Sequence, residues 1–324
     1  MPSPIVTKQK RGLLQGHSAM VVNPKRKLLQ DMVNDWDLYL MLLFPLGFLL
    51  VFKYLPMVGL TMAFQQYDIF EGYGGSPWVG LENFAKLFSS MEFPVVLRNT
   101  LLISWYKILF FFPIPIVVAI MLNEITHSGY KRTLQTIIYL PHFLSWVIVA
   151  GLVFDMFSNT GGINQVLSML GGEKRRFMME PSLFRSLVVG SAVWKEAGYS
   201  AIVFLAGITA IDPTLYEAAV VDGASRIKQI IHVTIPGILP IIVITLLLRV
   251  GTVMDANVEQ IMAMYNPTVY ATGDVIGTYI YRTGLSNMEY SYASAAGLFN
   301  SVISFTLVVA ANAASRKLVS RSLW

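Results

Sequence analysis

Charged, amide and aromatic side chains interrupt three long apolar segments in the second half of this sequence. A charge at the centre of a bilayer costs about 2.5–3.5 kcal/mol on insertion scales, so such residues mark solute pathways or ion pairs. The interruptions fall in the fourth, fifth and sixth apolar segments of the chain. They are Trp194, Lys195, Glu196 and Tyr199, then Arg249, Asp255, Asn257 and Glu259, then Asn300.

The residue types suit binding of a hydroxylated solute. Trp194 and Tyr199 offer flat faces on which sugar rings can stack, and Glu196 can accept hydrogen bonds from hydroxyl groups. Asp255 and Glu259 are four residues apart, which predicts that they share one face of a helix. We therefore expect a polar cavity between the fourth, fifth and sixth segments.

Two basic residues extend this expectation. Lys195 and Arg249 would also suit an acidic sugar. The alternative is that Lys195, Arg249, Asp255 and Glu259 neutralise one another as structural ion pairs. The sequence leaves that alternative open for each residue, and it does not identify the solute or its length.

The elements that must position these residues are membrane spans. The 324 residues are 55% apolar and only 13% charged, whereas soluble domains average about 25% charged residues. Six apolar segments exceed the roughly 20 residues that a spanning helix needs. They cover about 38–64, 95–122, 133–157, 184–210, 237–264 and 292–314, which predicts an all-α, polytopic membrane protein.

Basic residues beside these segments predict the orientation. They gather in residues 1–36, in the turn at Lys131 and Arg132, in residues 211–236 and in residues 315–324. The positive-inside rule places all four in the cytoplasm, although the cluster "EKRR" at 173–176 opposes the trend. Residues 1–36 have no apolar core, so we interpret them as a basic cytoplasmic tail rather than a cleavable signal. Residues 37–314 are then expected to form the membrane-embedded body and residues 315–324 a second tail.

Enzyme and metal motifs are absent from the sequence. It has no phosphate-binding G-x-x-x-x-G-K-[ST], no H-E-x-x-H and no G-x-S-x-G. The four histidines lack metal-ligand spacing, and there is no cysteine. We therefore predict no catalytic residue, no metal site and no cofactor bound by this chain.

A polar segment between the fourth and fifth spans has an unusual construction: "LYEAAVVDGASRIKQIIHVTIPGILP", residues 215–240. Asp212 is a candidate N-cap, with Pro213 at the first helical position. A short helix then carries Glu217, Gly223 breaks it, and Pro236 is expected to end a second helix before the fifth span. This predicts two short helices across the cytoplasmic mouth, forming a docking element.

The second of these helices is predicted to be amphipathic. Ile227, Ile230 and Ile231 are expected on one face. The other face should hold mainly Arg226, Lys228 and Gln229.

The segment resembles the cytoplasmic signature of permease subunits in binding-protein-dependent ABC importers. That signature is Glu-Ala-Ala, three residues, Gly, nine residues, then Ile-x-Leu-Pro. Here Val and Ile replace its Ile and Leu in "VTIP", residues 233–236. The resemblance implies that this loop fits a cleft on a cytoplasmic ATPase and that Glu217 meets a basic residue there. The coupling residues would be Glu217, Ala218, Ala219, Asp222, Gly223 and Pro236.

Further segments, including "WVGLENF" and "RTLQTIIYLPHFLSWVI", look like the carbohydrate-uptake branch of this family. Within it the chain is similar to permeases for complex saccharides, including those of bacterial alginate importers. The resemblance implies six spans with both termini cytoplasmic, in the bacterial inner membrane. It also implies a second permease subunit, an extracytoplasmic solute-binding protein, and two ATPase subunits that hold ATP and magnesium.

A different class of protein remains an alternative, namely an ion-gradient-driven secondary transporter. Such a chain would be self-sufficient and often carries inverted repeats and broken spans. The sequence shows no repeat of this kind. That reading would also leave the segment at 211–236 without a role.

Overall fold

The computed structural model describes residues 35–319, with side chains through residue 316. Within that range the only β feature is a single bridge between Gln65 and Trp78, so the all-α prediction is confirmed. The chain divides into two units, residues 1–58 and residues 59–324, and each is described by itself.

The described part of the first unit is one continuous apolar helical stretch. It consists of α2 (Trp36–Leu49), the π-turn η1 (Leu50–Tyr54) and the first residues of the 3-10 segment η2 (Leu55–Phe64). None of the 14 residues of α2 is buried by the chain itself, and its side chains are apolar on nearly every side. A helix that is apolar all round is typical of a membrane span.

The helical stretches match the predicted polytopic fold. Within residues 35–319, five are long and apolar enough to cross a membrane by length and composition: Trp36–Phe64, Glu92–Glu124, Trp146–Met169, Arg226–Gly251 and Tyr290–Arg316. A sixth is counted when α10 (Pro181–Thr209) and α11 (Pro213–Val221), which are bent by 70°, are taken together. The charges of Lys195 and Glu196 lower the hydropathy of α10, whose 29 residues are long enough to span alone.

The predicted third span at 133–157 is wrong, because two helices share it. These are α7 (Ser128–Tyr139) and α8 (Trp146–Phe157), with the 3-10 turn η4 (Leu140–Phe143) between them. Pro141 lacks an N–H group and lies in the first turn of η4, and the chain leaves helical geometry at Leu144, whose ψ of 142° is extended. The Ser145 hydroxyl then caps the new helix by accepting the Ile148 N–H at 3.3 Å. The apolar stretch continues instead through α9 (Gly162–Met169).

The predicted fifth span at 237–264 is also displaced. A helix runs without interruption through α12 (Arg226–Gln229), the π-turn η6 (Ile230–Thr234) and α13 (Ile235–Gly251), and α14 (Val258–Met264) is a separate helix. Pro236 does not end the second helix, as expected from the sequence, but lies in the first turn of α13. The wider π-turn before it accommodates a residue that lacks an N–H group.

The second unit is built around α10 and α17 (Tyr290–Val319). α10 packs on α6 (Pro113–Glu124) and α13, whereas α17 packs on α13, α16 (Ile276–Tyr281) and α4 (Glu82–Ser89). The remaining elements are α3 (Gly72–Gly75), α5 (Glu92–Tyr106), η3 (Lys107–Phe111), η5 (Phe177–Met179), η7 (Pro267–Val269), α15 (Tyr270–Gly273) and η8 (Arg282–Ser286).

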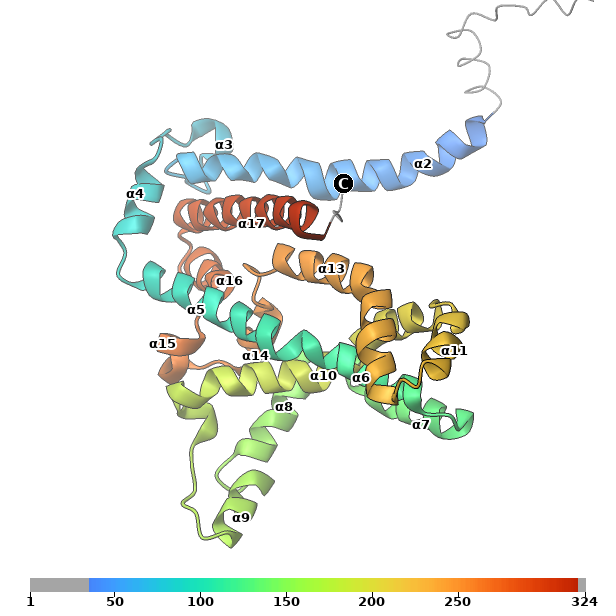
Figure 1. Ribbon diagram of the computed structural model, residues 1–324. Helices are drawn as coiled ribbons and strands as arrows, with labels where there is room; N and C mark the ends of the chain where they lie inside the picture. Colours follow the sequence, from blue (N-terminus) through green and yellow to red (C-terminus); the bar gives the residue numbers. More distant parts are fainter. Residues whose placement is uncertain (1–34, 320–324) are drawn as a thin grey trace, which may run out of the picture. The chain divides into compact units, whose positions relative to one another are not determined.

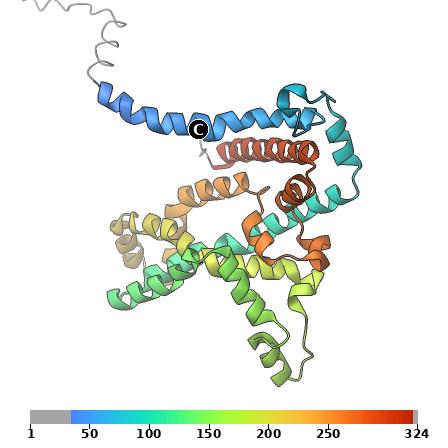
Figure 2. The ribbon, with the colours of Figure 1, turned by 180° about the vertical axis from the view of Figure 1, so that it is seen from behind.

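The opposite views in Figures 1 and 2 show which elements share an end of this unit. The helices α7 and α11 lie at one end, and α4 and α15 lie at the other. The helices α8 and α9 project from α10 as an arm. The basic turn at Lys131 and Arg132, within α7, therefore shares an end with the 211–236 segment, as the charge pattern predicts.

Candidate functional site

The 211–236 segment begins as predicted. Asp212 caps α11, and its Oδ1 accepts the Thr214 N–H at 2.9 Å. Pro213 occupies the first turn of the helix. Gly223 follows α11 with a φ of 72°, a left-handed conformation that glycine adopts without steric cost. The predicted cap and the predicted helix break are confirmed.

No residue of α11 is buried by the rest of the chain. Glu217 is exposed, and so are the apolar side chains of Leu215, Val220 and Val221. The hydroxyl groups of Tyr216 in α11 and Thr234 in η6 form a hydrogen bond of 2.9 Å that connects the helix to the following segment. The helix therefore presents a mixed apolar and acidic surface that this chain does not cover.

The predicted faces of the second helix are wrong at three positions. Gln229 is only 5% exposed, whereas Ile227 is 69% exposed and Ile231 is 51% exposed. The Gln229 side-chain amide donates to the Ala224 carbonyl at 3.0 Å and so satisfies a backbone group just after the glycine turn. Hydrogen-bonding needs of the turn override the hydrophobic periodicity here.

A cavity of about 360 Å³ lies within the second unit, among the walls of α5, η3, α8, α10, α13 and α14. Its lining mixes charged, polar and aromatic side chains with a few aliphatic ones. The lining residues are Ser104, Lys107, Ile108, Phe111, Trp146, Ala192, Glu196, Arg249, Thr252, Val253, Asp255, Ala256, Asn257 and Glu259.

Five of the residues singled out from the sequence meet in this cavity: Glu196, Arg249, Asp255, Asn257 and Glu259. Four others do not line it: Trp194, Lys195, Tyr199 and Asn300. Trp194 is half exposed on another side of α10, and Asn300 lies within α17. The predicted residues that line the cavity thus come from α10 and the α13–α14 region, and no lining residue comes from α17.

The acidic residues reach the cavity by a route that the sequence did not predict. Asp255 and Glu259 do not share a helical face, because α13 ends at Gly251 and α14 begins at Val258. Between these helices the chain turns, with left-handed φ angles of 50° at Ala256 and 59° at Asn257. The Asn257 side chain caps α14 by accepting the Gln260 N–H at 3.3 Å.

Lys195 and Glu196 form an ion pair rather than two free contacts. The Lys195 Nζ lies 3.1 Å from Glu196 Oε1 and donates to the His142 carbonyl at 2.9 Å. His142 Nδ1 lies 3.2 Å from the other carboxylate oxygen of Glu196, and its ring stacks on Tyr199 with centroids 3.8 Å apart. Side chains of α10 therefore contact η4, and Lys195 is in an ion pair, although its partner is Glu196 and not the Asp255 or Glu259 of the predicted alternative.

Lys107 in η3 is a cavity residue that sequence reasoning missed. Its Nζ donates to the Ala256 carbonyl at 3.0 Å and to Gln260 Oε1 at 2.8 Å, and Gln260 in turn donates to the Val188 carbonyl at 2.6 Å. Nearby, the Ser104 hydroxyl donates to the Val253 carbonyl. The sequence did offer a signal for Lys107, because it is a lysine inside the second apolar segment. A charge there indicates a functional or paired position as strongly as the charges in the later segments do.

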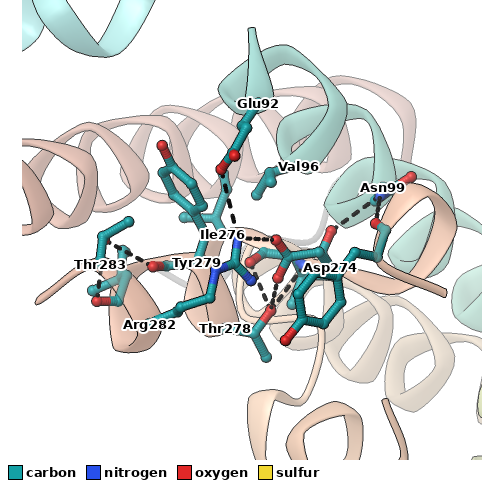
Figure 3. Close-up of polar contacts among 12 residues, drawn as sticks. Glu92, Val96, Asn99, Asp274, Ile276, Thr278, Tyr279, Arg282 and Thr283 are labelled. Carbon is teal, nitrogen blue, oxygen red and sulfur yellow. Dashed lines mark hydrogen bonds and ion pairs between the residues drawn. The ribbon is translucent and has the colours of Figure 1, made fainter. Parts of the chain in front are cut away.

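A second polar cluster holds the chain between α15 and η8 (Figure 3). The Arg282 guanidinium lies 2.7 Å from Asp274 Oδ2, and the Thr278 hydroxyl donates to Asp274 Oδ1 at 2.7 Å. The Asn99 amide donates to the Asp274 carbonyl at 3.1 Å, and Glu92 lies 3.7 Å from Arg282. Burial acts to lower the pKa of Arg282, but the hydrogen bond and the negative charge of Asp274, together with the nearby Tyr270 and Tyr265, raise the pKa overall. The cluster fixes these loop segments to α5 and lies outside the cavity lining.

Comparisons with known proteins agree with this architecture. Residues 111–322 match the family model described as binding-protein-dependent transport system inner membrane component. The polygalacturonan/rhamnogalacturonan transport system permease protein of Bacillus subtilis (strain 168) is 41% identical over 294 residues, covering 90% of this chain and 92% of the relative. An arabinooligosaccharides transport system permease protein of the same organism is 29% identical and covers 79% and 80%.

Solved structures with a similar fold also belong to ABC transporters. A crystal structure of a bacterial ABC transporter involved in the import of the acidic polysaccharide alginate contains a chain that is 44% identical, with a TM-score of 0.85. The match covers 90% of this chain and 99% of that one. A second structure shows a bacterial alginate ABC transporter in complex with an alginate pentasaccharide-bound periplasmic protein, with the same identity and TM-score and coverage of 92% and 100%.

Proposed function

Because this chain belongs to the family of binding-protein-dependent transport system inner membrane components, we propose that it forms half of the translocation path of an ATP-driven saccharide importer. The family is a transport permease family, so the chain is a membrane transport component rather than an enzyme. Relatives named for the transport of pectic polysaccharides and arabinooligosaccharides support a saccharide as the solute. An ion-gradient-driven secondary transporter is not favoured by this family membership.

The observation that carries the proposal is the uncovered surface of α11. A soluble partner must cover its exposed leucine and valines, and the exposed Glu217 offers that partner an acceptor for a basic side chain. We assign this role to one of two cytoplasmic ATPases that bind ATP and magnesium. Glu217, Ala218, Ala219, Asp222 and Gly223 form the docking surface, and Pro236 lies in the helix that follows.

One helix connects this surface to the cavity. The helix Arg226–Gly251 starts just after the Gly223 turn, and its far end carries Arg249 into the cavity wall. At 1.5 Å per residue it is about 39 Å long, so a displacement of α11 reaches the solute through a single rigid element. Closure of the ATPase pair on ATP opens the cavity outward, and hydrolysis resets it inward.

The same proposal assigns the other partners. A second permease subunit forms the other half of the path, and an extracytoplasmic solute-binding protein delivers the saccharide. A bacterial relative of this fold has been solved with a periplasmic protein, which supports that partner. We place the chain in the bacterial inner membrane, with both termini and residues 211–236 in the cytoplasm.

Reversing the charge of Glu217 tests the coupling. Glu217→Arg should lower saccharide-stimulated ATP hydrolysis at least tenfold, because it removes a charged hydrogen bond worth roughly 1.5–3 kcal/mol and adds repulsion against a basic partner. The assay is ATP hydrolysis by the complete importer in proteoliposomes, with its solute-binding protein and saccharide. The matched control is Glu173→Arg, a charge reversal of another exposed glutamate far along the chain from α11.

We expect Glu217→Arg to assemble normally in the membrane but to lose the stimulation of ATP hydrolysis by saccharide. Glu173→Arg should behave as wild type. Unchanged stimulation in Glu217→Arg would contradict the assigned docking surface. Uptake by this chain without any ATPase would overturn the importer proposal in favour of a secondary transporter.

A further inference from the structure

Arg249 is a cation without a hydrogen-bond acceptor among the described residues. Across residues 35–316, no carboxylate, carbonyl or hydroxyl group accepts a hydrogen bond from its guanidinium, and no ion pair involves it. An arginine near the end of an apolar helix ordinarily acquires a carboxylate or carbonyl partner, because unpaired charges are costly there. Its donors are therefore available to a bound molecule.

An aromatic side chain holds this cation in place. The guanidinium carbon lies 4.5 Å from the centroid of the Phe111 ring, and both residues line the cavity. A cation–π contact attracts the charge without using a hydrogen-bond acceptor. The planar fork of Arg249 is thus positioned at the cavity wall while its N–H groups keep their full donor capacity.

The two other basic groups near the cavity are already engaged. Lys195 donates to Glu196 and to the His142 carbonyl, and it does not line the cavity. Lys107 lines the cavity but uses two of its donors on Ala256 and Gln260. Among the described cavity residues, Arg249 is the cation with the most capacity left for an anion.

We propose that Arg249 is the anchor that binds a carboxylate of an acidic saccharide, with Phe111 as its positioning residue. The inference rests on the proposed saccharide importer and narrows its solute class to uronate-containing chains. A planar fork matches a carboxylate bidentately. Asp255, Glu259 and Glu196 line the same cavity, where their carboxylates accept hydrogen bonds from the hydroxyl groups of the sugar.

A purely structural role for Arg249 makes a different prediction. It lies in the last turn of α13, where any positive charge interacts favourably with the helix dipole. Arg249→Lys keeps that charge but loses the planar fork. A dipole role therefore tolerates lysine, whereas carboxylate anchoring does not.

The test is equilibrium binding to the assembled permease–ATPase complex in nanodiscs, without the solute-binding protein and without ATP. The probes are radiolabelled pentasaccharides of galacturonate and of mannuronate, each compared with the same pentasaccharide after its carboxyl groups have been reduced to alcohols. Wild type is compared with Arg249→Gln and Arg249→Lys. Arg98→Gln is the control, since Arg98 is an exposed arginine of α5 outside the cavity lining.

We expect both Arg249 variants to bind at least one uronate probe roughly tenfold more weakly than wild type, which corresponds to about 1.4 kcal/mol. Neither should change binding of the reduced probes, and Arg98→Gln should match wild type throughout. Three results would each contradict the role of Arg249 as a carboxylate anchor. These are equal losses of affinity for uronate and reduced probes, wild-type affinity of Arg249→Lys for the uronate probes, and no uronate binding by wild type at millimolar concentration. The Glu217→Arg assay does not depend on these binding measurements. Failure of the Arg249 proposal would therefore leave the importer proposal intact.

Discussion

Gly198→Val should largely prevent the protein from folding in the membrane. A Cβ atom at Gly198 would collide with the Ile138 carbonyl oxygen and the Ile138 side chain, because α10 crosses directly against the end of α7. Overpacking usually costs about 1–3 kcal/mol, and a clash with backbone that cannot rotate away should exceed that range. The measurement is the yield and the melting temperature of detergent-purified protein, followed by fluorescence-detected size exclusion.

The same helix provides the control for this substitution. A Cβ at Gly190 meets no atom within 4 Å. Gly190→Ala should therefore raise stability by up to about 1 kcal/mol through helix propensity, whereas Gly198→Ala should lower it. A Gly198→Ala protein that melts at or above the wild-type temperature would show that α10 and α7 do not approach this closely.

Asp274→Ala should produce the second largest loss of stability, about 3 kcal/mol. The Asp274 side chain is only 4% exposed and accepts both the Thr278 hydroxyl and the Arg282 guanidinium. Its removal leaves a cation that is 23% exposed without its 2.7 Å partner, and breaking a buried pair from one side typically costs 3–5 kcal/mol. Because water has partial access to Arg282, we expect a loss of stability at the lower end of that range. The readout is again the melting temperature of purified protein.

Glu92 offers a matched control within the same cluster (Figure 3). Its carboxylate lies 3.7 Å from Arg282 and its side chain is 69% exposed, so Glu92→Gln should cost no more than about 1 kcal/mol. The double variant Asp274→Ala, Arg282→Ala should be less destabilised than the sum of the two single variants. Strict additivity would contradict the assigned pair.

Local signals in the sequence predicted local structure well. Asp212, Pro213 and Gly223 each act through backbone geometry within one helical turn, and all three occupy the predicted positions. Apolar length likewise predicted the polytopic α-helical fold, because a span is defined by composition alone. These features need no knowledge of which elements pack together.

The cavity depends on contacts that periodicity does not encode. Asp255 and Glu259 were assigned to one helix, but the chain breaks at Gly251 and resumes at Val258, and the apolar pattern continues across that break. Likewise, the 3-10 turn η4 and the extended residue Leu144 interrupt an apolar segment that hydropathy treats as continuous. Lys107 was overlooked because its partners lie about 150 residues away in the chain. Side-chain partners at such separations follow from packing, not from spacing.

The turn between α13 and α14 has a consequence for how such proteins diverge. It supplies Asp255 and Asn257 to the cavity from irregular backbone, whereas most of the other lining residues lie on packed helices. Met254 and Ala256 of this turn are buried and Asn257 caps α14, whereas Asp255 is exposed, so substitution of Asp255 should disturb helix packing little. We therefore expect duplicated copies of this gene to acquire new solute preferences first through this short turn, while the surrounding helices retain their sequence.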